Sequence, residues 1–153
     1  MSRQDRFAVE CLAARRATWM EINLQALAGN LRVLKEVCRN RPIWAVVKAD
    51  AYGHGAVACS RTLAEAGVHG LVVALPEEGV ALRRAGITLP ILLTGALPTD
   101  GAESLVRHDI APAISAVEEL EALSAGACAS GRQASFHLEI DTGMTRMGVA
   151  PAE

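Results

Sequence analysis

Hydrophobic residues follow two alternating patterns along the chain. Some segments repeat leucine, valine or alanine every three to four residues, which is typical of amphipathic helices, and between them lie short apolar runs typical of buried strands. The first elements predicted are a short strand at residues 18–22 and a helix that ends near residue 39. Five further strands are predicted at residues 43–47, 70–75, 91–94, 110–114 and 136–140, with helices at residues 56–66, 76–86, 100–108 and 115–127.

The regular spacing of these units predicts the fold class. The five strands begin roughly 20 to 27 residues apart, which indicates a parallel sheet covered by helices. No Gly-x-Gly-x-x-Gly follows the strand at residues 43–47, which disfavours a doubly wound dinucleotide-binding sheet and favours a (β/α)8 barrel. Such a barrel needs eight units and about 250 residues. The expected fold is therefore α/β, an incomplete (β/α)8 TIM-type barrel that lacks its C-terminal part and a C-terminal β domain.

Helix termini are marked by proline, serine and acidic residues. Pro76 opens a predicted helix that has Glu77 and Glu78 in its first turn, where negative charge is favourable. Ser115 is predicted to cap the helix that follows it, with Glu118 completing a capping box.

Composition narrows the possible partners. The net charge is −2 and 51% of the residues are hydrophobic, which argues against nucleic acid or an anionic membrane surface as the main partner. No apolar run approaches the roughly 18 residues of a membrane span. Residues 1–17 are basic but lack the apolar stretch of a secretory signal, so we interpret them as a disordered extension before a folded part at 18–153.

The four cysteines are scattered and show no Cys-x-x-Cys pair or Cys/His ligand spacing. They are interpreted as reduced thiols that act as small core residues, which predicts a cytoplasmic protein without a metal site. These residues are Cys11, Cys38, Cys59 and Cys128.

Lys48 is the leading candidate for chemistry. Only Lys35 and Lys48 are lysines among fifteen Lys and Arg residues. Lys48 directly follows the strand at residues 43–47, which is predicted to be buried on both faces. Desolvation at such a position favours a neutral, nucleophilic amine; the alternative is a lysine that extends its ammonium group to solvent. A second polar, glycine-rich segment, residues 141–148, follows the last strand. Because barrel active sites gather at the C-terminal ends of strands, we expect both segments at one mouth.

Both segments resemble signatures of one family. Residues 45–55, Ala-Val-Val-Lys-Ala-Asp-Ala-Tyr-Gly-His-Gly, resemble the pyridoxal-phosphate attachment signature of alanine racemases, and residues 141–148, Asp-Thr-Gly-Met-Thr-Arg-Met-Gly, resemble a second one. Residues 18–32 also look like the family's usual opening. The resemblance implies an isomerase that interconverts L- and D-alanine with pyridoxal 5'-phosphate by a two-base mechanism. It also implies a cytoplasmic homodimer that supplies D-alanine for peptidoglycan.

The resemblance assigns roles to three residues. Lys48 would hold the cofactor as a Schiff base and act as one of the two bases. Tyr52, the only tyrosine, would donate its hydroxyl to the cofactor phosphate; the alternative is a half-buried turn aromatic. Arg146 would approach the phenolic oxygen of the cofactor and bind the substrate carboxylate in two places. For Arg146 the alternative is a surface ion pair with Asp141 or Glu139.

The neighbours of these residues are interpreted as structural. Asp50 and His54 are assigned to the turn and not to acid–base chemistry. The glycines of both segments are expected to serve backbone geometry close to a ligand; they are Gly53, Gly55, Gly143 and Gly148.

The chain also departs from the family pattern. Many members have a carbamylated lysine at the position of Glu139, and we hypothesise that Glu139 supplies the same negative charge to orient Arg146. The second base, a tyrosine from the C-terminal domain of a partner subunit, and the arginine that faces the pyridine nitrogen have no counterpart here. The chain alone is therefore expected to be inactive and at best a weak cofactor binder.

Three other readings were considered. Another pyridoxal-phosphate barrel, such as a broad-specificity racemase or a decarboxylase, is disfavoured by the Ala-Asp-Ala-Tyr-Gly-His-Gly sequence after Lys48. A non-catalytic pyridoxal-phosphate-binding protein or fragment is the main alternative. An unstable fragment without function is the third.

Overall fold

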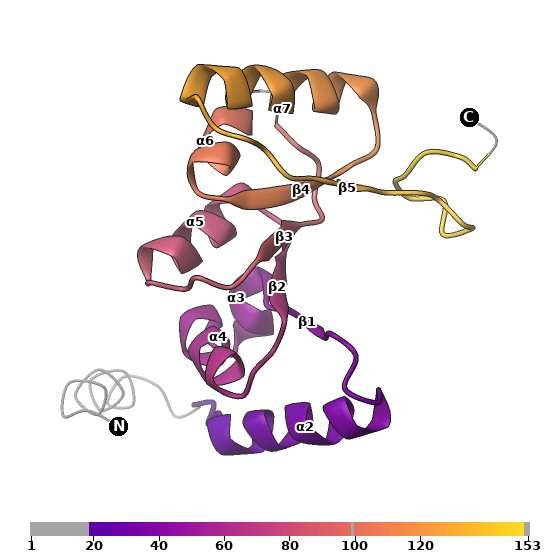
Figure 1. Ribbon diagram of the computed structural model, residues 1–153. Coiled ribbons are helices and arrows are strands. Elements are labelled where there is room, and N and C mark those ends of the chain that lie inside the picture. The colour runs from indigo at the N-terminus through magenta and orange to yellow at the C-terminus, as the bar shows by residue number, and fades with distance from the viewer. Residues whose placement is uncertain (1–18, 99, 152–153) are drawn as a thin grey trace.

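The computed structural model describes residues 19–98 and 100–151, which form one parallel sheet and the helices that cover it (Figure 1). The strand order is β1-β2-β3-β4-β5, so each strand pairs with the next one along the chain. The strands are β1 (Trp44–Val46), β2 (Gly70–Val73), β3 (Ile91–Leu93), β4 (Ile110–Ile114) and β5 (His137–Leu138). The helical elements are α2 (Leu24–Val37), α3 (Lys48–Gly53), α4 (Ala56–Glu65), α5 (Pro76–Arg84), α6 (Ala102–Arg107) and α7 (Val117–Ser130).

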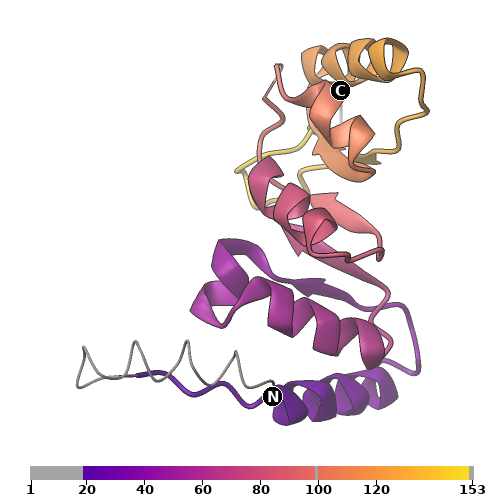
Figure 2. The same cartoon turned by 90° about the vertical axis from the view of Figure 1, so that its left-hand side faces the viewer.

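The sheet is curved like part of a barrel. Helices α4 to α7 lie on one side of the strands, as two perpendicular views show (Figures 1 and 2). In a flat sheet β1 and β5 would be four strand spacings apart, or roughly 19 Å. Instead, the Trp44 ring on β1 lies 6.0 Å, between centroids, from the His137 ring on β5. The parallel α/β architecture and its partial-barrel form are confirmed.

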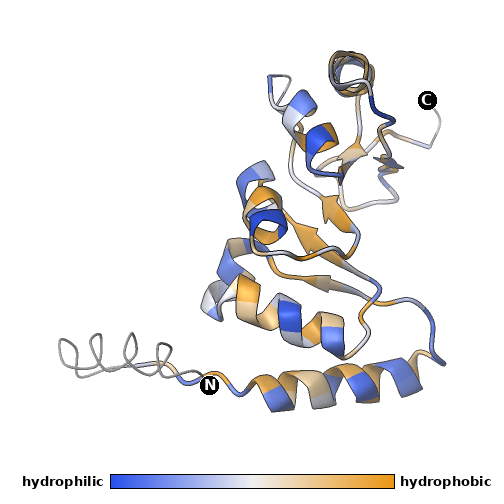
Figure 3. Ribbon diagram, turned by 60° about the vertical axis from the view of Figure 1, so that its left-hand side comes forward, coloured by the Kyte–Doolittle hydropathy of each residue, from blue (hydrophilic) through white to orange (hydrophobic). Residues whose placement is uncertain are grey.

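The hydrophobic core lies between the strands and the helices. All four residues of β2 are buried, and the strands are among the most hydrophobic segments of the chain (Figure 3). Leu71, Leu93 and Leu105 are fully buried at this interface. Burying a leucine side chain contributes about 1.5–3 kcal/mol, so this layer is what holds the strand ends in place.

The prediction that residues 43–47 form a strand buried on both faces is wrong. In β1, Trp44 and Ala45 are half-buried and Val46 is 45% exposed. The reason is its place in the sheet: β1 pairs only with β2 and forms an edge, whereas β2 is enclosed between two neighbours. Apolar composition therefore indicated a strand here but overstated its burial.

Residues 19–22 do not form the predicted strand. They have no regular secondary structure and pair with no strand in the part of the chain that the structure describes. A strand requires hydrogen bonds to a neighbour, which hydrophobic pattern alone cannot supply. Residue 18 and the predicted extension at residues 1–17 lie outside the described residues.

The last two elements differ from the prediction at their ends. α7 begins after Ala116, and the predicted capping box of Ser115 and Glu118 is not formed: Glu119 accepts the hydrogen bond from the Ala116 N–H at the start of the helix. α7 also continues to Ser130, where Gly131, with φ 63°, ends it; this glycine was the overlooked stop signal. The predicted strand at 136–140 shortens to His137–Leu138, because Ile140 bridges instead to Val149 in the returning loop.

The thiols are only partly core residues. Cys59 is buried, but Cys38 and Cys128 are exposed, so the prediction of small core residues is wrong for those two. Cys11 lies outside the described residues. Within residues 19–98 and 100–151, none of the helices combines the length and the apolar character needed to span a membrane.

Glu119 makes the stability of the fold pH-dependent. Burial acts to raise the pKa of its carboxyl group, but hydrogen bonds from Ser115, Leu97 and Ala116 outweigh burial and lower that pKa. A lowered pKa means that the carboxylate stabilises the fold above its unfolded pKa, and that this contribution disappears as pH falls through the folded pKa.

We therefore expect Glu119→Gln to lower the melting temperature at pH 7, and the difference from the unmodified chain to shrink at acid pH, as the pH falls below the ordinary glutamate pKa and through the lower pKa of the folded state. Thermal unfolding followed by circular dichroism measures both values. Glu118→Gln, at an exposed neighbouring position, is the control and should change little. An equal Glu119→Gln effect at both pH values would contradict this account.

Candidate active site

Lys48 begins a turn with an unusual backbone. Ala49, Asp50, Ala51 and Tyr52 have φ between 50° and 55° and ψ between 39° and 51°, which is left-handed helical geometry. For residues with a side chain this conformation costs about 1–2 kcal/mol each, so it persists only where the surroundings impose it. Gly53, with φ 80°, continues the run. The sequence indicated a glycine turn here but not four strained residues before the glycine.

Hydrogen bonds from several elements hold this left-handed turn. The Ala49 N–H donates to Oε1 of Glu78 on α5, at 2.5 Å. The Ala56 N–H donates to Oδ1 of Asp50 at 2.7 Å, which places the Asp50 carboxylate at the start of α4. Ala51 is buried beneath the turn. The turn is therefore fixed from both sides, and Asp50 has the structural surroundings that the sequence predicted.

His54 closes the turn. Its Nδ1 lies 2.9 Å from the Ala51 carbonyl oxygen and 3.0 Å from that of Tyr52. Both partners can only accept hydrogen bonds, so Nδ1 must carry a proton. This contact agrees with the interpretation of His54 as a turn residue.

The turn sets the relation between Lys48 and Tyr52. Tyr52 follows Lys48 by four residues, about one helical turn, through the left-handed segment that begins at Ala49. Lys48 is half-buried, whereas Tyr52 is 58% exposed. The exposed phenol does not match the alternative of a half-buried turn aromatic and leaves its hydroxyl accessible to a ligand.

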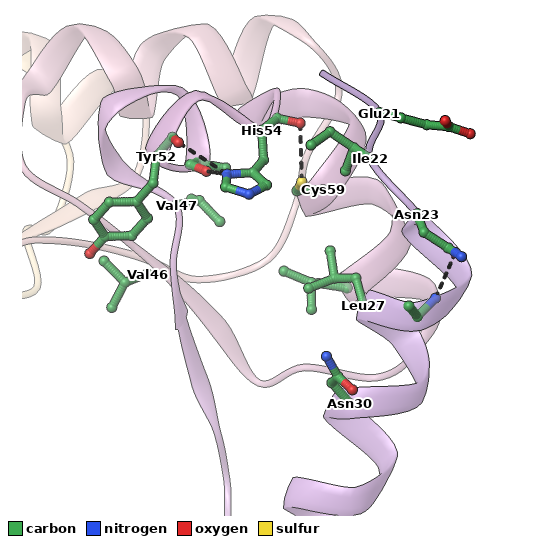
Figure 4. A pocket seen from close by; sticks show the side chains of 13 residues that line it. Glu21, Ile22, Asn23, Leu27, Asn30, Val46, Val47, Tyr52, His54 and Cys59 are labelled. Carbon is green, nitrogen blue, oxygen red and sulfur yellow. Dashed lines mark hydrogen bonds between the residues drawn. The ribbon is translucent and has the colours of Figure 1, made fainter. Parts of the chain in front are cut away.

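A cavity of about 480 Å³ lies behind the turn, between it and α2 (Figure 4). Tyr52, His54 and Cys59 line it from the turn and α4, and Asn30 lines it from α2. Lys48 and Arg146 do not line it, so this cavity is not the place where their chemistry would meet. Burial, and secondly the charge of Asp50, raise the pKa of the Cys59 thiol, which keeps it protonated.

The second signature forms a loop after β5. Oδ1 of Asp141 accepts hydrogen bonds from the N–H groups of Gly143 and Thr145, and these bonds lower the pKa of its carboxyl group. Gly148 has φ 103°, and a Cβ there would lie 2.7 Å from the Asp141 nitrogen. Gly143, at φ 128°, also has a backbone that favours glycine. Gly53 and Gly55 also have positive φ, at 80° and 89°, so the backbone part of the prediction is confirmed for the glycines of both segments.

Arg146 is exposed at the tip of this loop. Within residues 19–98 and 100–151 the ion pairs join Arg83 to Asp109 and Arg107 to Glu103, and none involves Arg146. Neither the alternative of a surface ion pair nor a direct Glu139–Arg146 contact is therefore found. The role of Glu139 stays a hypothesis without structural support.

The topology places both signatures on the same rim. Lys48 follows β1 and the Asp141–Gly148 loop follows β5, and all five strands are parallel, so both segments lie at the carboxyl edge. They stand at opposite ends of that edge, and no hydrogen bond or ion pair joins them in the described part of the chain. Curvature of the sheet turns the two ends toward a common interior.

Comparison with known proteins identifies the family. Residues 22–153 match the model of the alanine racemase N-terminal domain. The chain belongs to the alanine racemase family. Its N-terminal domain model spans most of the residues described above, including the left-handed turn and the loop that carries Arg146.

Similar proteins are alanine racemases of bacteria. The chain is 42% identical over 138 residues to alanine racemase of Clostridium novyi, covering 90% of this chain and 36% of that protein. The solved alanine racemase of Clostridium difficile 630 shares 40% identity and a TM-score of 0.86 over 90% of this chain and 37% of that one. A histidine racemase from Leuconostoc mesenteroides is also similar, at 29% identity and a TM-score of 0.77, over 83% of this chain and 34% of that one. The chain thus spans little more than a third of the length of these relatives.

The residues at the rim fit the cofactor that the alanine racemase family implies. A pyridoxal phosphate site needs a primary amine and donors for phosphate. Lys35 is bound to the Ala66 carbonyl at 2.9 Å, which leaves Lys48 as the lysine at the carboxyl edge. A Cβ at Gly53 or Gly55 would meet no atom within 4 Å, so the backbone beyond the turn borders open space.

Proposed function

We propose that the whole protein of which these residues form part is a pyridoxal-phosphate-dependent alanine racemase. The observation that supports this proposal is the left-handed turn that directly follows Lys48 at the carboxyl edge and includes Tyr52. Strained backbone of this kind is concentrated at functional sites because it orients side chains that a relaxed turn would not. Membership of the alanine racemase family supports the same reaction.

Lys48, Tyr52 and Arg146 then have distinct tasks. Pyridoxal phosphate, when bound, supplies the electron-withdrawing ring that makes the substrate α-proton acidic. The Lys48 amine would hold the cofactor and would carry a proton to or from one face of the substrate α-carbon. The Tyr52 hydroxyl donates to a phosphate oxygen, and the Arg146 guanidinium binds a carboxylate through two N–H groups.

The remaining features are proposed from the same family. The base for the opposite face would come from a partner subunit, which makes the whole protein a homodimer. The substrate would be alanine, and the product D-alanine would serve peptidoglycan synthesis in the cytoplasm. The main alternative, a non-catalytic pyridoxal-phosphate-binding protein, requires Lys48 and Tyr52 but no second base.

A chimera tests this proposal. Residues 22–151 would replace the matching segment of the Clostridium novyi alanine racemase, which supplies the remaining two thirds of a complete protein. We expect the chimera to bind pyridoxal phosphate and to interconvert L- and D-alanine, measured by chiral chromatography. A folded chimera that binds cofactor without racemising would favour the non-catalytic alternative, and one that binds no cofactor would contradict both. Histidine is assayed in parallel, because a histidine racemase shares the fold.

Tyr52→Phe should weaken cofactor binding without affecting the fold. The substitution removes one hydroxyl donor to a charged phosphate, which is worth about tenfold in dissociation constant. The ring remains, so the melting temperature should not change. Titration of the chimera with pyridoxal phosphate, followed by absorbance, measures the constant. An unchanged constant would remove Tyr52 from the phosphate site.

A further inference from the structure

Glu78 makes two different connections with its two carboxylate oxygens. Oε2 accepts hydrogen bonds from the N–H groups of Ala74, at 2.9 Å, and Leu75, at 3.0 Å, and thereby caps the start of α5. Oε1 reaches in the other direction, to the N–H of Ala49, the first residue of the left-handed turn. One side chain on α5 therefore joins the end of β2 to the residue that follows Lys48.

The hydrogen bond from Ala49 to Glu78 is made at a strained residue of the left-handed turn. Ala49 is exposed, so burial of its side chain contributes little there, and its φ of 50° is unfavourable for an alanine. A hydrogen bond to a carboxylate is worth more than one between neutral groups, and it can offset a strained residue. The sequence placed Glu78 in a helix first turn, but a contact across 29 residues has no local signal.

Glu119 repeats the same arrangement without a lysine. Its Oε2 accepts the N–H groups of Ser115 at 2.8 Å and Ala116 at 3.2 Å at the start of α7, and its Oε1 lies 3.4 Å from the Leu97 nitrogen in the loop after β3. Glu78 and Glu119 are thus a matched pair: both close a helix and reach one neighbouring segment, but only Glu78 reaches the residue that follows the proposed cofactor lysine.

We propose that Glu78 is a positioning residue for Lys48, holding the left-handed turn through the Ala49 N–H so that the lysine keeps its place at the rim. The structural part of this inference stands on the contacts alone. Its consequence for cofactor capture rests on the proposed function. The two are therefore tested by separate measurements.

Glu78→Gln separates capping from positioning. A glutamine can turn its carbonyl oxygen to the two N–H groups of Ala74 and Leu75, which keeps the helix cap. Its amide NH2 then faces the Ala49 N–H, where two donors oppose each other. We expect hydrogen exchange at the Ala49 amide, measured by nuclear magnetic resonance, to accelerate by about tenfold, with Ala74 and Leu75 unchanged. Glu119→Gln should leave the Ala49 amide as it is.

Lysine labelling gives the functional measurement. Pyridoxal phosphate condenses with an amine and releases one water, and borohydride then reduces the C=N bond to a secondary amine that peptide mass spectrometry locates. Lys35 is the internal reference in each sample, since it is the only other lysine. We expect the ratio of Lys48 to Lys35 labelling to fall about fivefold or more in Glu78→Gln and to stay constant in Glu119→Gln. A purely structural role would lower stability in both variants and leave the ratio unchanged.

The outcomes distinguish the two proposals. If labelling of the unmodified chain shows no preference for Lys48 over Lys35, the proposed cofactor binding at this rim is wrong. Hydrogen exchange at the Ala49 amide then still tests whether Glu78 holds the turn. If Glu78→Gln does not fold, hydrogen exchange at the Ala49 amide of the unmodified chain tests the proposal instead. An Ala49 amide without protection there would show that Glu78 does not hold the turn. The proposal would also be overturned if the Ala49 amide were equally protected in the unmodified chain and in Glu78→Gln. The same holds if the unmodified chain prefers Lys48 and Glu78→Gln leaves the labelling ratio unchanged.

Discussion

Replacing Lys48 with alanine is expected to lower racemisation by the chimera at least about 1,000-fold, because the change removes both the covalent attachment of the cofactor and a base. Lys48 stands at the carboxyl end of β1, directly before the left-handed turn, and the described residues offer no second lysine at that rim. The rates of L-to-D and D-to-L conversion are both measured, together with the absorbance of bound pyridoxal phosphate. Both rates should fall, because each direction passes through the same attachment.

Two variants make this result specific. Lys48→Arg keeps the positive charge but offers a guanidinium that stays protonated, so it should lose activity like the alanine variant. Lys35→Ala removes the other lysine, whose ammonium group donates to the Ala66 carbonyl at the C-terminal end of α4, and should retain full activity. Activity in Lys48→Ala within tenfold of the unmodified chimera would contradict the proposed role.

Gly95→Ala is expected to lower the free energy of unfolding by about 3 kcal/mol, the upper end of the cost of inserting a group into packed space. A Cβ on Gly95 would lie only 2.0 Å from the carbonyl oxygen of Ala74, so backbone must move. Ala74 donates its own N–H to Glu78, which in turn accepts from Ala49. The displacement should therefore also reach the left-handed turn. Urea denaturation of the unmodified and variant chains measures the difference.

Gly29→Ala is the matched control for that change. Gly29 lies inside α2, and a Cβ there would meet only the Arg32 side chain, at 3.9 Å. Alanine is the better helix former, so this substitution should stabilise the chain by up to about 1 kcal/mol. The same chemical change thus has opposite expected signs at two glycines. Equal effects would show that the close approach of Gly95 to Ala74 does not matter for stability.

The substitutions Gly95→Ala and Glu78→Gln are expected to affect the proposed site through the same set of contacts. Ala74, Glu78 and Ala49 form a chain of backbone and carboxylate contacts along the carboxyl edge. A perturbation at the end of β2 or β3 should therefore change Lys48 labelling, although neither Gly95 nor Glu78 belongs to the first signature. Substitutions at the opposite edge, such as in the loop at Gly86, have no such connection in the described residues.

The sequence by itself determined the order of the five paired strands and their helices, the parallel α/β class and the two segments to which chemistry is proposed. These follow from local signals: hydrophobic periodicity separates strands from helices, glycine and proline mark their ends, and the signature residues are contiguous. The same locality explains the errors. The strand predicted at residues 18–22 and the predicted burial of both faces of β1 each required neighbouring elements in the fold. The hydrophobic pattern along the chain contains no information about whether such a neighbour is present.

Only the tertiary structure decided how the site is held. The left-handed turn at Ala49–Tyr52 has no glycine within it to signal its backbone, and it exists because contacts from α5 and α4 impose it. The meeting of Trp44 and His137 likewise depends on the curvature of the whole sheet. Sequence specified which side chains are available at the carboxyl edge. Contacts between residues distant in the chain fixed their backbone, because strained geometry is stable only where several elements converge on it.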